Sequence, residues 1–438
     1  QLSMLSGLLG LIPGIGIYLA LLLSAANWVF STLFLLIGHY FSRWFLYPFV
    51  SRPTLRDLAV YYAAVAIFAW WRPLWFRLVR PRWRNASTSL RIFAVAVAAL
   101  AVAGIVVSGH NEKSAMRSRG TLDVNVLSVG YASAILVDTP DNHAILVDTS
   151  FIQTDRGRRN DPERTVLPQI FAKKINHLEA LVLTCPEPEH SAGVGSILKY
   201  MDVDHFYYPA AAAGLLTQEP LAALLAARSP LRFVPRLTGT AIAPQQLTAG
   251  DVVYQSTCNG KPFRIEALGP AAGDDQAPLS LRITYGDFAM LIPSELTLAE
   301  QKNFLATVPP EKLKADVVVA PHHGTAGLET ITIGIPDNLD QQLAETTGAL
   351  LKATGADAVI FEFGNPRPVL DLKYKDAVKI QGATRRAAED ALPKALNVAT
   401  DTEGAIHVVS DGVTHHVYTQ LGATGSNVDE PSLLEIGW

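Results

Sequence analysis

The feature that most constrains the fold of this chain is its uncharged N-terminal run. From Leu2 to Ser42 there is no formally charged residue. Residues 92–109 form a second uncharged run, rich in Ala, Val, Ile and Phe. About 18 consecutive apolar residues are enough to indicate a membrane-spanning helix, and both runs meet that condition. We therefore expect residues 1–110 to form a membrane region built from helices.

Four helices are expected there, at residues 2–23, 28–50, 58–76 and 90–108. The third can span only if Arg72 snorkels to the interface, because 14 residues separate Asp57 from Arg72. A dense basic loop, residues 77–84, follows it, and the positive-inside rule places such a loop in the cytoplasm. Binding of this loop to anionic lipid headgroups would imply the same side.

This orientation predicts a multi-pass protein of the cell inner or plasma membrane with an extracytoplasmic C-terminal domain. If the third helix does not span, the basic loop no longer fixes the side. Because the chain does not begin with Met and its first run lacks the features of a signal peptide, we interpret it as part of a larger membrane protein.

The charge of the chain changes after the membrane region. Residues 1–120 carry 12 Lys and Arg but 2 Asp and Glu, which leaves 24 and 38 for the remainder of the 438 residues. An acidic domain has no electrostatic advantage in binding a polyanion such as DNA. The two cysteines, Cys185 and Cys258, neither require nor exclude a disulfide.

The second part of the chain has the pattern of an α/β domain. After a polar linker at residues 111–120, short β-branched and apolar runs alternate with helical stretches, expected at residues 194–200 and 209–232. Residues 423–438 are polar and are expected to form a mobile tail. The expected strands are at residues 122–127, 134–138, 144–148, 180–184, 206–208, 264–268, 279–285, 289–292, 315–320, 358–363 and 405–409.

Polar side chains follow several of these strands at the point where each strand ends. Asp148 follows "AILV", the segment 185–190 ("CPEPEH") follows "LVLT", and Glu295 follows "FAMLIPS". The pair His322–His323 follows "VVVAP". Loops at the ends of strands gather active-site groups in α/β folds, so a single site is expected at these positions.

In this order, the elements resemble the metallo-β-lactamase fold. Residues 121–412 more narrowly resemble the C-terminal domain of the ComEC family of competence DNA-uptake channels. The resemblance predicts an α-helical membrane region followed by an α/β metallo-β-lactamase-like domain, an αββα sandwich, at residues 121–422. It is carried by "VLSVGYASA" (126–134), "AILVDTS" (144–150), "LVLTCPEPEHSAG" (181–193), "LRITYGDFAMLIPSEL" (281–296), "VVVAPHHGT" (317–325), "FGNPRP" (363–368) and "TDTEGAI" (400–406).

The resemblance implies a membrane component of DNA uptake. Its outer domain would act as a metal-dependent nuclease, a phosphodiesterase that degrades the strand that is not imported. The partners would be DNA, single-stranded during uptake, together with membrane lipid, the remainder of the channel and other competence proteins.

The metal motifs of this family are altered in this chain. Where the family has His, Asp or His, Asp and His, the chain has Cys185, Glu187, Glu189 and His190. The bridging Asp of the family corresponds to Glu295. Asn365 replaces a late His, and Ser128 and Ser133 replace two acidic residues. The change from Asp to Glu keeps the charge but moves the carboxylate by about 1.5 Å.

The remaining donors define the candidate site. Cys, Glu and His suit zinc or manganese, and a thiolate favours zinc. A bound ion would activate water and stabilise phosphoryl oxygens. The metal candidates are Cys185, Glu187, Glu189, His190, Glu295 and His322, and the catalytic candidates are Asp148, Glu189, His322 and His323. Of the two metal positions expected in such a site, the one with the more complete set of ligands combines Glu189, His190, Glu295 and one histidine of the 322–323 pair.

Plainer roles are open for the same residues. Cys185 could be a small buried hydrophobe, and Glu187 part of a stiff solvated loop. His190 could hold the helix that follows it, and Asp148 could orient its loop by accepting backbone hydrogen bonds.

Three functions therefore stay open. The domain is an altered or degraded nuclease of a DNA-uptake protein, a metal-free structural or gating module, or a membrane-anchored metal-dependent hydrolase of a non-nucleic substrate.

Overall fold

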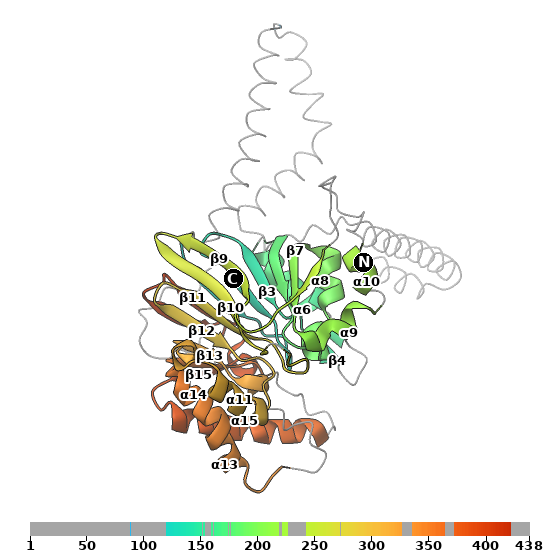
Figure 1. Ribbon diagram of the computed structural model, residues 1–438. Coiled ribbons are helices and arrows are strands. Elements are labelled where there is room, and N and C mark those ends of the chain that lie inside the picture. The colour runs from blue at the N-terminus through green and yellow to red at the C-terminus, as the bar shows by residue number, and fades with distance from the viewer. Residues whose placement is uncertain are drawn as a thin grey trace, which may run out of the picture. The chain divides into compact units, whose positions relative to one another are not determined.

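The computed structural model shows an α/β domain formed by the second part of the chain (Figure 1). It describes Thr88 and residues 120–150, 152–153, 159–160, 162–173, 175, 177–218, 221–226, 242–271, 273–325, 335–363 and 372–421. The four predicted membrane helices lie outside the described residues, as do residues 111–119, Asn365 and the tail. Within the described ranges, no helix has both the length and the apolar character needed to cross a bilayer.

The first sheet has eight strands and is antiparallel on one side and parallel on the other. The parallel part runs from the strand at Ala144–Val147 to the edge strand at Pro244–Gln246. In spatial order the strands are β17 (His415–Thr419), β16 (Ile406–Ser410), β1 (Leu122–Val126), β2 (Ile135–Asp138), β3 (Ala144–Val147), β6 (His177–Val182), β7 (Asp202–Tyr208) and β8 (Pro244–Gln246). The last hairpin of the domain therefore pairs with its first strand.

The second sheet has seven strands and the same division. Its parallel part runs from β12 to β15. In spatial order the strands are β15 (Leu396–Ala399), β14 (Ala358–Phe361), β13 (Val317–Val319), β12 (Phe288–Ile292), β11 (Ser280–Tyr285), β10 (Lys261–Gly269) and β9 (Val252–Cys258). Two short strands, β4 (Ile152–Gln153) and β5 (Arg159–Asn160), pair separately.

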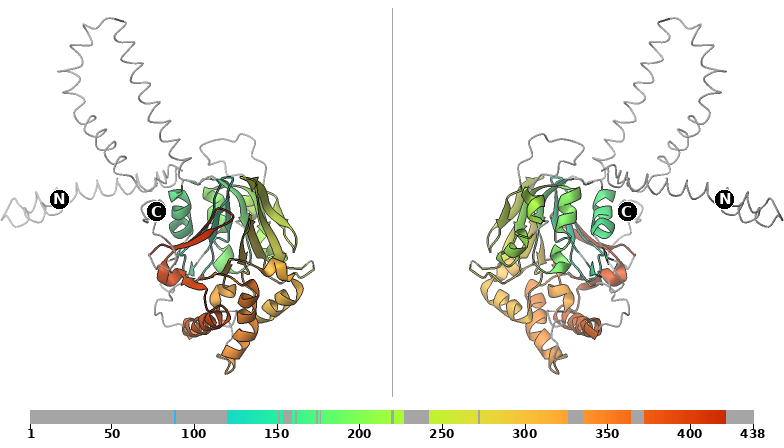
Figure 2. Two further views of the ribbon diagram at one scale, coloured as in Figure 1. Left: turned by 90° about the vertical axis from the view of Figure 1, so that its left-hand side faces the viewer. Right: turned by 90° about the vertical axis from the view of Figure 1, so that its right-hand side faces the viewer.

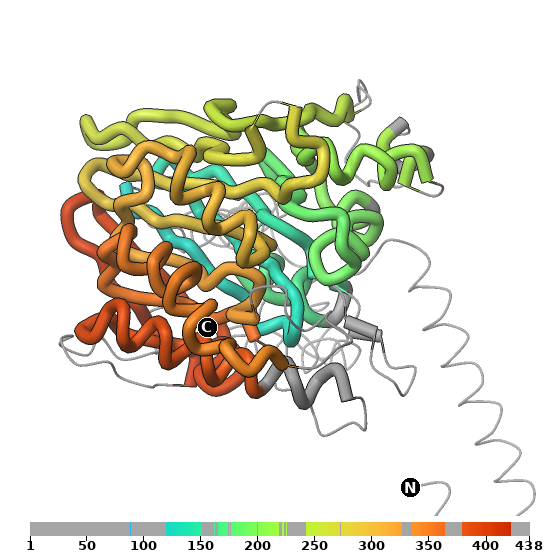
Figure 3. The backbone as a smooth tube through the Cα atoms, turned by 60° about the horizontal axis from the view of Figure 1, so that its bottom comes forward, coloured from blue at the N-terminus to red at the C-terminus, as the bar shows by residue number. Residues whose placement is uncertain are grey.

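Helices cover the outer faces of the two sheets, and those of the first and second halves gather on different sides of the strands (Figures 2 and 3). Those of the first half are α6 (Pro162–Ala172), α7 (Pro188–Ser191), α8 (Val194–Tyr200), η2 (Ala210–Ala212), α9 (Ala213–Leu216) and α10 (Leu221–Ala226). Those of the second half are α11 (Leu298–Thr307), α12 (Pro310–Leu313), η3 (Pro321–Gly324), α13 (Leu339–Leu343), η5 (Ala344–Gly348), α14 (Ala349–Thr354), α15 (Leu372–Ala391) and α16 (Thr400–Glu403).

Three hydrophobic clusters account for this layering. The largest lies between the sheets and combines side chains of β1, β2, β3 and β6 with side chains of β10 to β14. A second lies between the first sheet and helices α6 and α8, and a third between the second sheet and α11 and α14. Strands such as β3 ("AILV") and β13 ("VVV") are apolar throughout because both of their faces are buried. The described part of the chain is an αββα sandwich, as expected.

Sequence reasoning misplaced some elements. The helix expected at residues 209–232 is divided into η2, α9 and α10, with residues 227–232 outside the description. Gly214 and Pro220 lie within that stretch, and both residue types disfavour a continuous helix. The elements that were not expected include strands β8, β9, β15 and β17 and helices α6, α11, α14 and α15.

Candidate functional site

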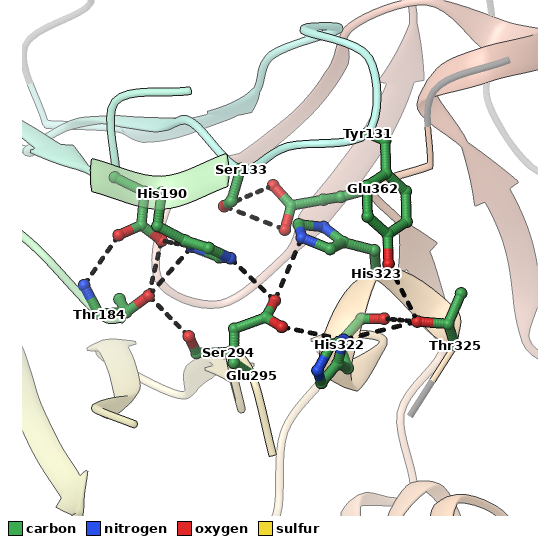
Figure 4. A network of polar contacts seen from close by, with 11 residues as sticks. Tyr131, Ser133, Thr184, His190, Ser294, Glu295, His322, His323, Thr325 and Glu362 are labelled. Carbon is green, nitrogen blue, oxygen red and sulfur yellow. Dashed lines mark hydrogen bonds and ion pairs between the residues drawn. The ribbon is translucent and has the colours of Figure 1, made fainter. Parts of the chain in front are cut away.

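The candidate site lies where the parallel strands of both sheets end. In the first sheet, β3 leads to Asp148, and β6 leads to the turn that carries His190. In the second sheet, β12 leads to Glu295, and β13 leads to His322 and His323 in η3. These residues are distant in sequence, yet the side chains of His190, His322 and His323 point toward Glu295 (Figure 4).

The backbone around this point adopts conformations that non-glycine residues usually avoid. Seven described non-glycine residues have a positive φ, and five of them belong to the site: Asp148 (59°), Ser150 (58°), Ser294 (59°), His322 (50°) and His323 (52°). The other two are asparagines, which tolerate this region. Such strain costs about 1–3 kcal/mol per residue and gathers at functional sites.

Glu295 is the centre of the cluster. Its Oε1 lies 2.8 Å from Nε2 of His190 and 3.1 Å from Nε2 of His323. Its Oε2 lies 2.9 Å from Nδ1 of His322. All four side chains are buried. One carboxylate therefore contacts three imidazoles that arrive from two loops.

Asp148 fixes the orientation of His190. The Asp148 Oδ2 atom lies 2.7 Å from Nδ1 of His190. Thr184 donates its backbone N–H to Oδ1 of Asp148 at 2.8 Å and its hydroxyl to Oδ2 at 2.7 Å. With Nδ1 engaged by a carboxylate, His190 presents Nε2 to Glu295, which is how histidine ligands are commonly oriented at metal sites.

The donor atoms form two groups that share Glu295. In each of two residue sets, one ligand atom per residue lies within 4.8 Å of the others: His190, Glu295 and His323, and Glu187, Glu295 and His322. Ligands of a tetrahedral zinc ion at about 2.0–2.1 Å lie about 3.3 Å apart. The contacts of Glu295 with His190 and His323 are a few tenths of an ångström shorter, so these two pairs of donors would have to separate by that amount to hold an ion. The donor atoms of His190 and His323 lie within 4.8 Å of each other.

Charge is strongly coupled across the cluster. Burial alone would lower the pKa of His190, but the carboxylates of Asp148 and Glu295 outweigh it and raise this pKa well above its usual value. Burial alone would raise the pKa of Glu295, but the charges of His322, His323 and His190 hold it well below its usual value. In the metal-free domain, a protonated His190 therefore carries an N–H on each ring nitrogen, one facing Asp148 and the other facing Glu295.

The structure does not bring every predicted ligand into these groups. Cys185 is buried with a free thiol, and burial together with the nearby charge of Glu295 raises its pKa, so the thiol stays protonated in the metal-free domain. Neither Cys185 nor Glu189 has a ligand atom in the groups found among the described residues. Glu187 is exposed but does reach the second group.

Sequence reasoning missed Glu362, which follows β14. Its carboxyl group is buried beside the histidines, and Ser133 Oγ lies 3.0 and 3.1 Å from its two oxygens (Figure 4). Burial raises the pKa of Glu362 to about 8, so the carboxyl group is largely protonated at neutral pH. Its place directly after a buried apolar strand was the available signal.

Tyr131, on the loop between β1 and β2, was also missed. Its ring lies 4.8 Å from that of His323 and meets Phe363 edge to face at 5.4 Å. Its hydroxyl lies 3.3 Å from Oγ1 of Thr325. The half-buried Tyr131 thus covers one side of the histidine cluster with an aromatic ring and a phenol.

The two-sheet sandwich, with a cluster of carboxylates and histidines at its strand ends, defines an α/β metallo-β-lactamase-like domain. The chain matches no protein-family model. Over 214 residues it is 24% identical to ComE operon protein 3 of Bacillus subtilis (strain 168). The match covers 47% of this chain and 26% of that protein, so the chain spans about a quarter of the length of this relative.

Solved structures of similar proteins are much more distant in sequence. The metallo-β-lactamase fold protein YhfI from Bacillus subtilis is 14% identical with a TM-score of 0.39, over 65% of this chain and 99% of that chain. The metal-dependent hydrolase Tm1679 of the β-lactamase superfamily is 10% identical with a TM-score of 0.36, over 65% and 98%. The short form of human tRNase Z is 13% identical with a TM-score of 0.32, over 56% and 93%.

Proposed function

We propose that residues 120–421 form a metal-binding domain whose ion is held by His190, Glu295 and His323. Zinc or manganese suits this set of two imidazoles and one carboxylate. The observation that carries the proposal is the position of Glu295, a single buried carboxylate contacted by three imidazoles. Glu187 and His322 would supply a second position that shares the same carboxylate.

Each residue has a separate task in this proposal. Asp148 keeps Nδ1 of His190 engaged and so directs Nε2 toward Glu295, where the ion would bind. The exposed Glu187 lies at the open side of the cluster, where substrate would enter. Glu362 is a protonated carboxyl group that could donate a proton at neutral pH. A bound ion would polarise a phosphoryl oxygen and lower the pKa of a bound water.

We propose further that the domain belongs to a membrane component of DNA uptake and hydrolyses phosphodiester bonds of the strand that is not imported. The similarity to ComE operon protein 3 and the ordered motifs that resemble the ComEC family support this role. In this proposal the N-terminal runs are membrane helices and the domain is extracytoplasmic. DNA, membrane lipid, the rest of the channel and other competence proteins are its partners.

The test is the metal content and the nuclease activity of the purified 438-residue chain. Elemental analysis should find bound zinc or manganese, and the ion should be lost in Glu295→Gln. Single-stranded DNA should be cleaved by the wild-type chain and not by this variant. An unoccupied wild-type protein that stays unoccupied after incubation with both ions would refute the metal-binding proposal. Bound metal without cleavage would refute the nuclease proposal alone.

A metal-free structural or gating module is the second candidate. It is favoured by the contacts of Glu295, whose two oxygens lie 2.8–3.1 Å from imidazole nitrogens without an ion between them. Under this alternative, chelators leave the thermal unfolding temperature unchanged. If the domain holds an ion, chelation should lower that temperature, because a ligand that binds only the folded state stabilises it.

A further inference from the structure

A second group of ligand-type side chains lies at the other end of β6 and β7. His177 and Glu179 belong to β6, and Asp204 belongs to the neighbouring strand β7. One ligand atom from each of the three lies within 4.8 Å of the others. Because β6 runs from His177 to Val182 and the candidate functional site lies beyond its far end, the start of the strand is separated from that site by about 17 Å or more, the length of such a strand.

The contacts of this cluster join three segments of the chain. Nε2 of His177 lies 3.1 Å from Oδ2 of Asp204. Oε2 of Glu179 lies 2.9 Å from Nδ1 of His143, which precedes β3. The side chains of His177, Glu179 and Asp204 are 37%, 22% and 31% exposed, so an ion would have access from solvent.

We propose that His177, Glu179 and Asp204 bind a divalent transition-metal ion, with zinc as the probe of choice, and that His143 is a positioning residue for Glu179. An imidazole with two carboxylates is a donor set that binds zinc, and solvent can fill the remaining position. The contact of His143 with Glu179 has the form of an outer-shell hydrogen bond that orients a ligating carboxylate.

Charge supports the same assignment. Glu179 and Asp204 belong to adjacent parallel strands, and a carboxylate oxygen of each lies within 4.8 Å of the other, close enough for two like charges to repel. A divalent cation between them neutralises both carboxylates at once. The contacts of His177 with Asp204 and of His143 with Glu179, each partly exposed, would give little stability on their own. The ion would thus link β6 to β7 at the ends where both strands begin.

The experiment is a zinc-binding measurement on the 438-residue chain by equilibrium dialysis and elemental analysis. His177→Ala and Asp204→Ala should each bind one ion fewer than the wild type. His143→Ala should weaken this binding by about tenfold or more. His205→Ala is the matched control, because this exposed β7 histidine stacks on Tyr207, and it should bind as many ions as the wild type.

The candidate functional site is unchanged in all these variants, so its occupancy cancels in the comparison. Equal zinc binding by wild type, His177→Ala and Asp204→Ala would overturn the proposal. If the alanine variants do not fold, His177→Gln and Asp204→Asn replace them with side chains of similar shape. In the unmodified chain, zinc should also protect His177 from diethyl pyrocarbonate, as mapped by mass spectrometry, and modification that is insensitive to zinc would refute the site.

Discussion

Glu295 Oε1 lies 2.8 Å from His190 Nε2, although the two residues are 105 positions apart in the chain. His190 follows β6 of the first sheet, and Glu295 follows β12 of the second. Their contact therefore joins the two sheets at the end of the sandwich where the parallel strands stop. The same pair of atoms forms the core of the proposed metal site, so the site is complete only when the two sheets are packed together.

Replacing Glu295 tests this double role. Glu295→Gln keeps the shape but removes the charge that three imidazoles share, so the ion should be lost. The free energy of unfolding should fall by about 3 kcal/mol, because breaking a buried charged pair leaves its partners uncompensated. Isothermal titration with zinc and denaturant unfolding provide the two measurements.

Glu266→Gln is the control for this substitution. Glu266 is also buried and also paired, with Arg264 at 3.3 Å and Lys312 at 3.1 Å, but on the far strand β10. We expect it to lose some stability and to bind zinc as the wild type does. Equal loss of zinc binding in both variants would contradict a ligand role for Glu295.

Ion binding should depend on pH through His190. Its pKa is raised by Asp148 and Glu295 in spite of burial, so at neutral pH a proton must leave Nε2 before an ion can bind there. Apparent affinity should therefore rise about tenfold per pH unit below that pKa, if one proton is released. Titration calorimetry in buffers of different ionisation enthalpy counts the protons, and a count of zero would exclude His190 as a ligand.

The stability of the metal-free domain should depend on pH in the opposite direction to its affinity for the ion. A histidine with a raised pKa contributes stability that is fully present below its unfolded pKa of about 6.5 and is lost as pH rises through the folded pKa. Higher pH thus weakens the metal-free domain and strengthens its ion binding. Unfolding curves with and without zinc should diverge as the pH increases.

The sequence predicted the strand ends well, because buried parallel strands are continuously apolar and a polar residue after them stands out. Asp148, Glu295 and the pair His322–His323 each follow such a strand, and the structure brings them together. The strands that were missed have a weaker signal. In β9, "VVYQSTC", three consecutive polar residues interrupt the apolar pattern, and β15 has only four residues.

The contribution of single donors could not be predicted from the turn itself. Cys185, Glu187, Glu189 and His190 occur within six positions, yet which of them face Glu295 depends on a loop from the other sheet. Glu362 was absorbed into an expected strand at residues 358–363, and its partner Ser133 is 229 positions away. Distances of this kind follow from the sandwich, not from local pattern.

Glu362 should make the metal-free domain less stable at high pH. Burial raises its pKa to about 8, with added repulsion from Asp148 and Glu295, against the hydrogen bond from Ser133. Its stabilising contribution is fully present below the unfolded pKa of about 4.3 and is lost as pH rises to about 8. Glu362→Gln cannot ionise, so it should be more stable than the wild type at pH 8, by on the order of 3 kcal/mol.

Denaturant unfolding in the presence of a chelator, between pH 5 and 9, measures this difference. The exposed Glu389 of α15 is the control, and Glu389→Gln should follow the wild-type curve at every pH. A constant offset between Glu362→Gln and the wild type would show that Glu362 keeps the same protonation state across this range.

Gly193, which ends the "HSAG" segment, should tolerate no side chain. A Cβ there would lie 2.4 Å from the carbonyl oxygen of Thr149, 2.7 Å from that of Ser150 and 2.4 Å from Cγ of Pro162. Two of these atoms are backbone, in the strained loop that begins at Asp148, so Gly193→Ala should displace the loop and the hold of Asp148 on His190. We expect a loss of about 2–3 kcal/mol in the free energy of unfolding, together with weaker zinc binding.

Gly214 in α9 separates this steric effect from the general effect of replacing glycine. A Cβ at Gly214 meets nothing within 4 Å. Gly214→Ala should therefore leave zinc binding intact and keep or raise stability by up to about 1 kcal/mol, because alanine favours helix. Denaturant unfolding and zinc titration of the two variants side by side are decisive. If Gly193→Ala has the same free energy of unfolding and the same zinc affinity as Gly214→Ala, then close packing of the turn against residues 149–150 is not what holds Asp148 in contact with His190.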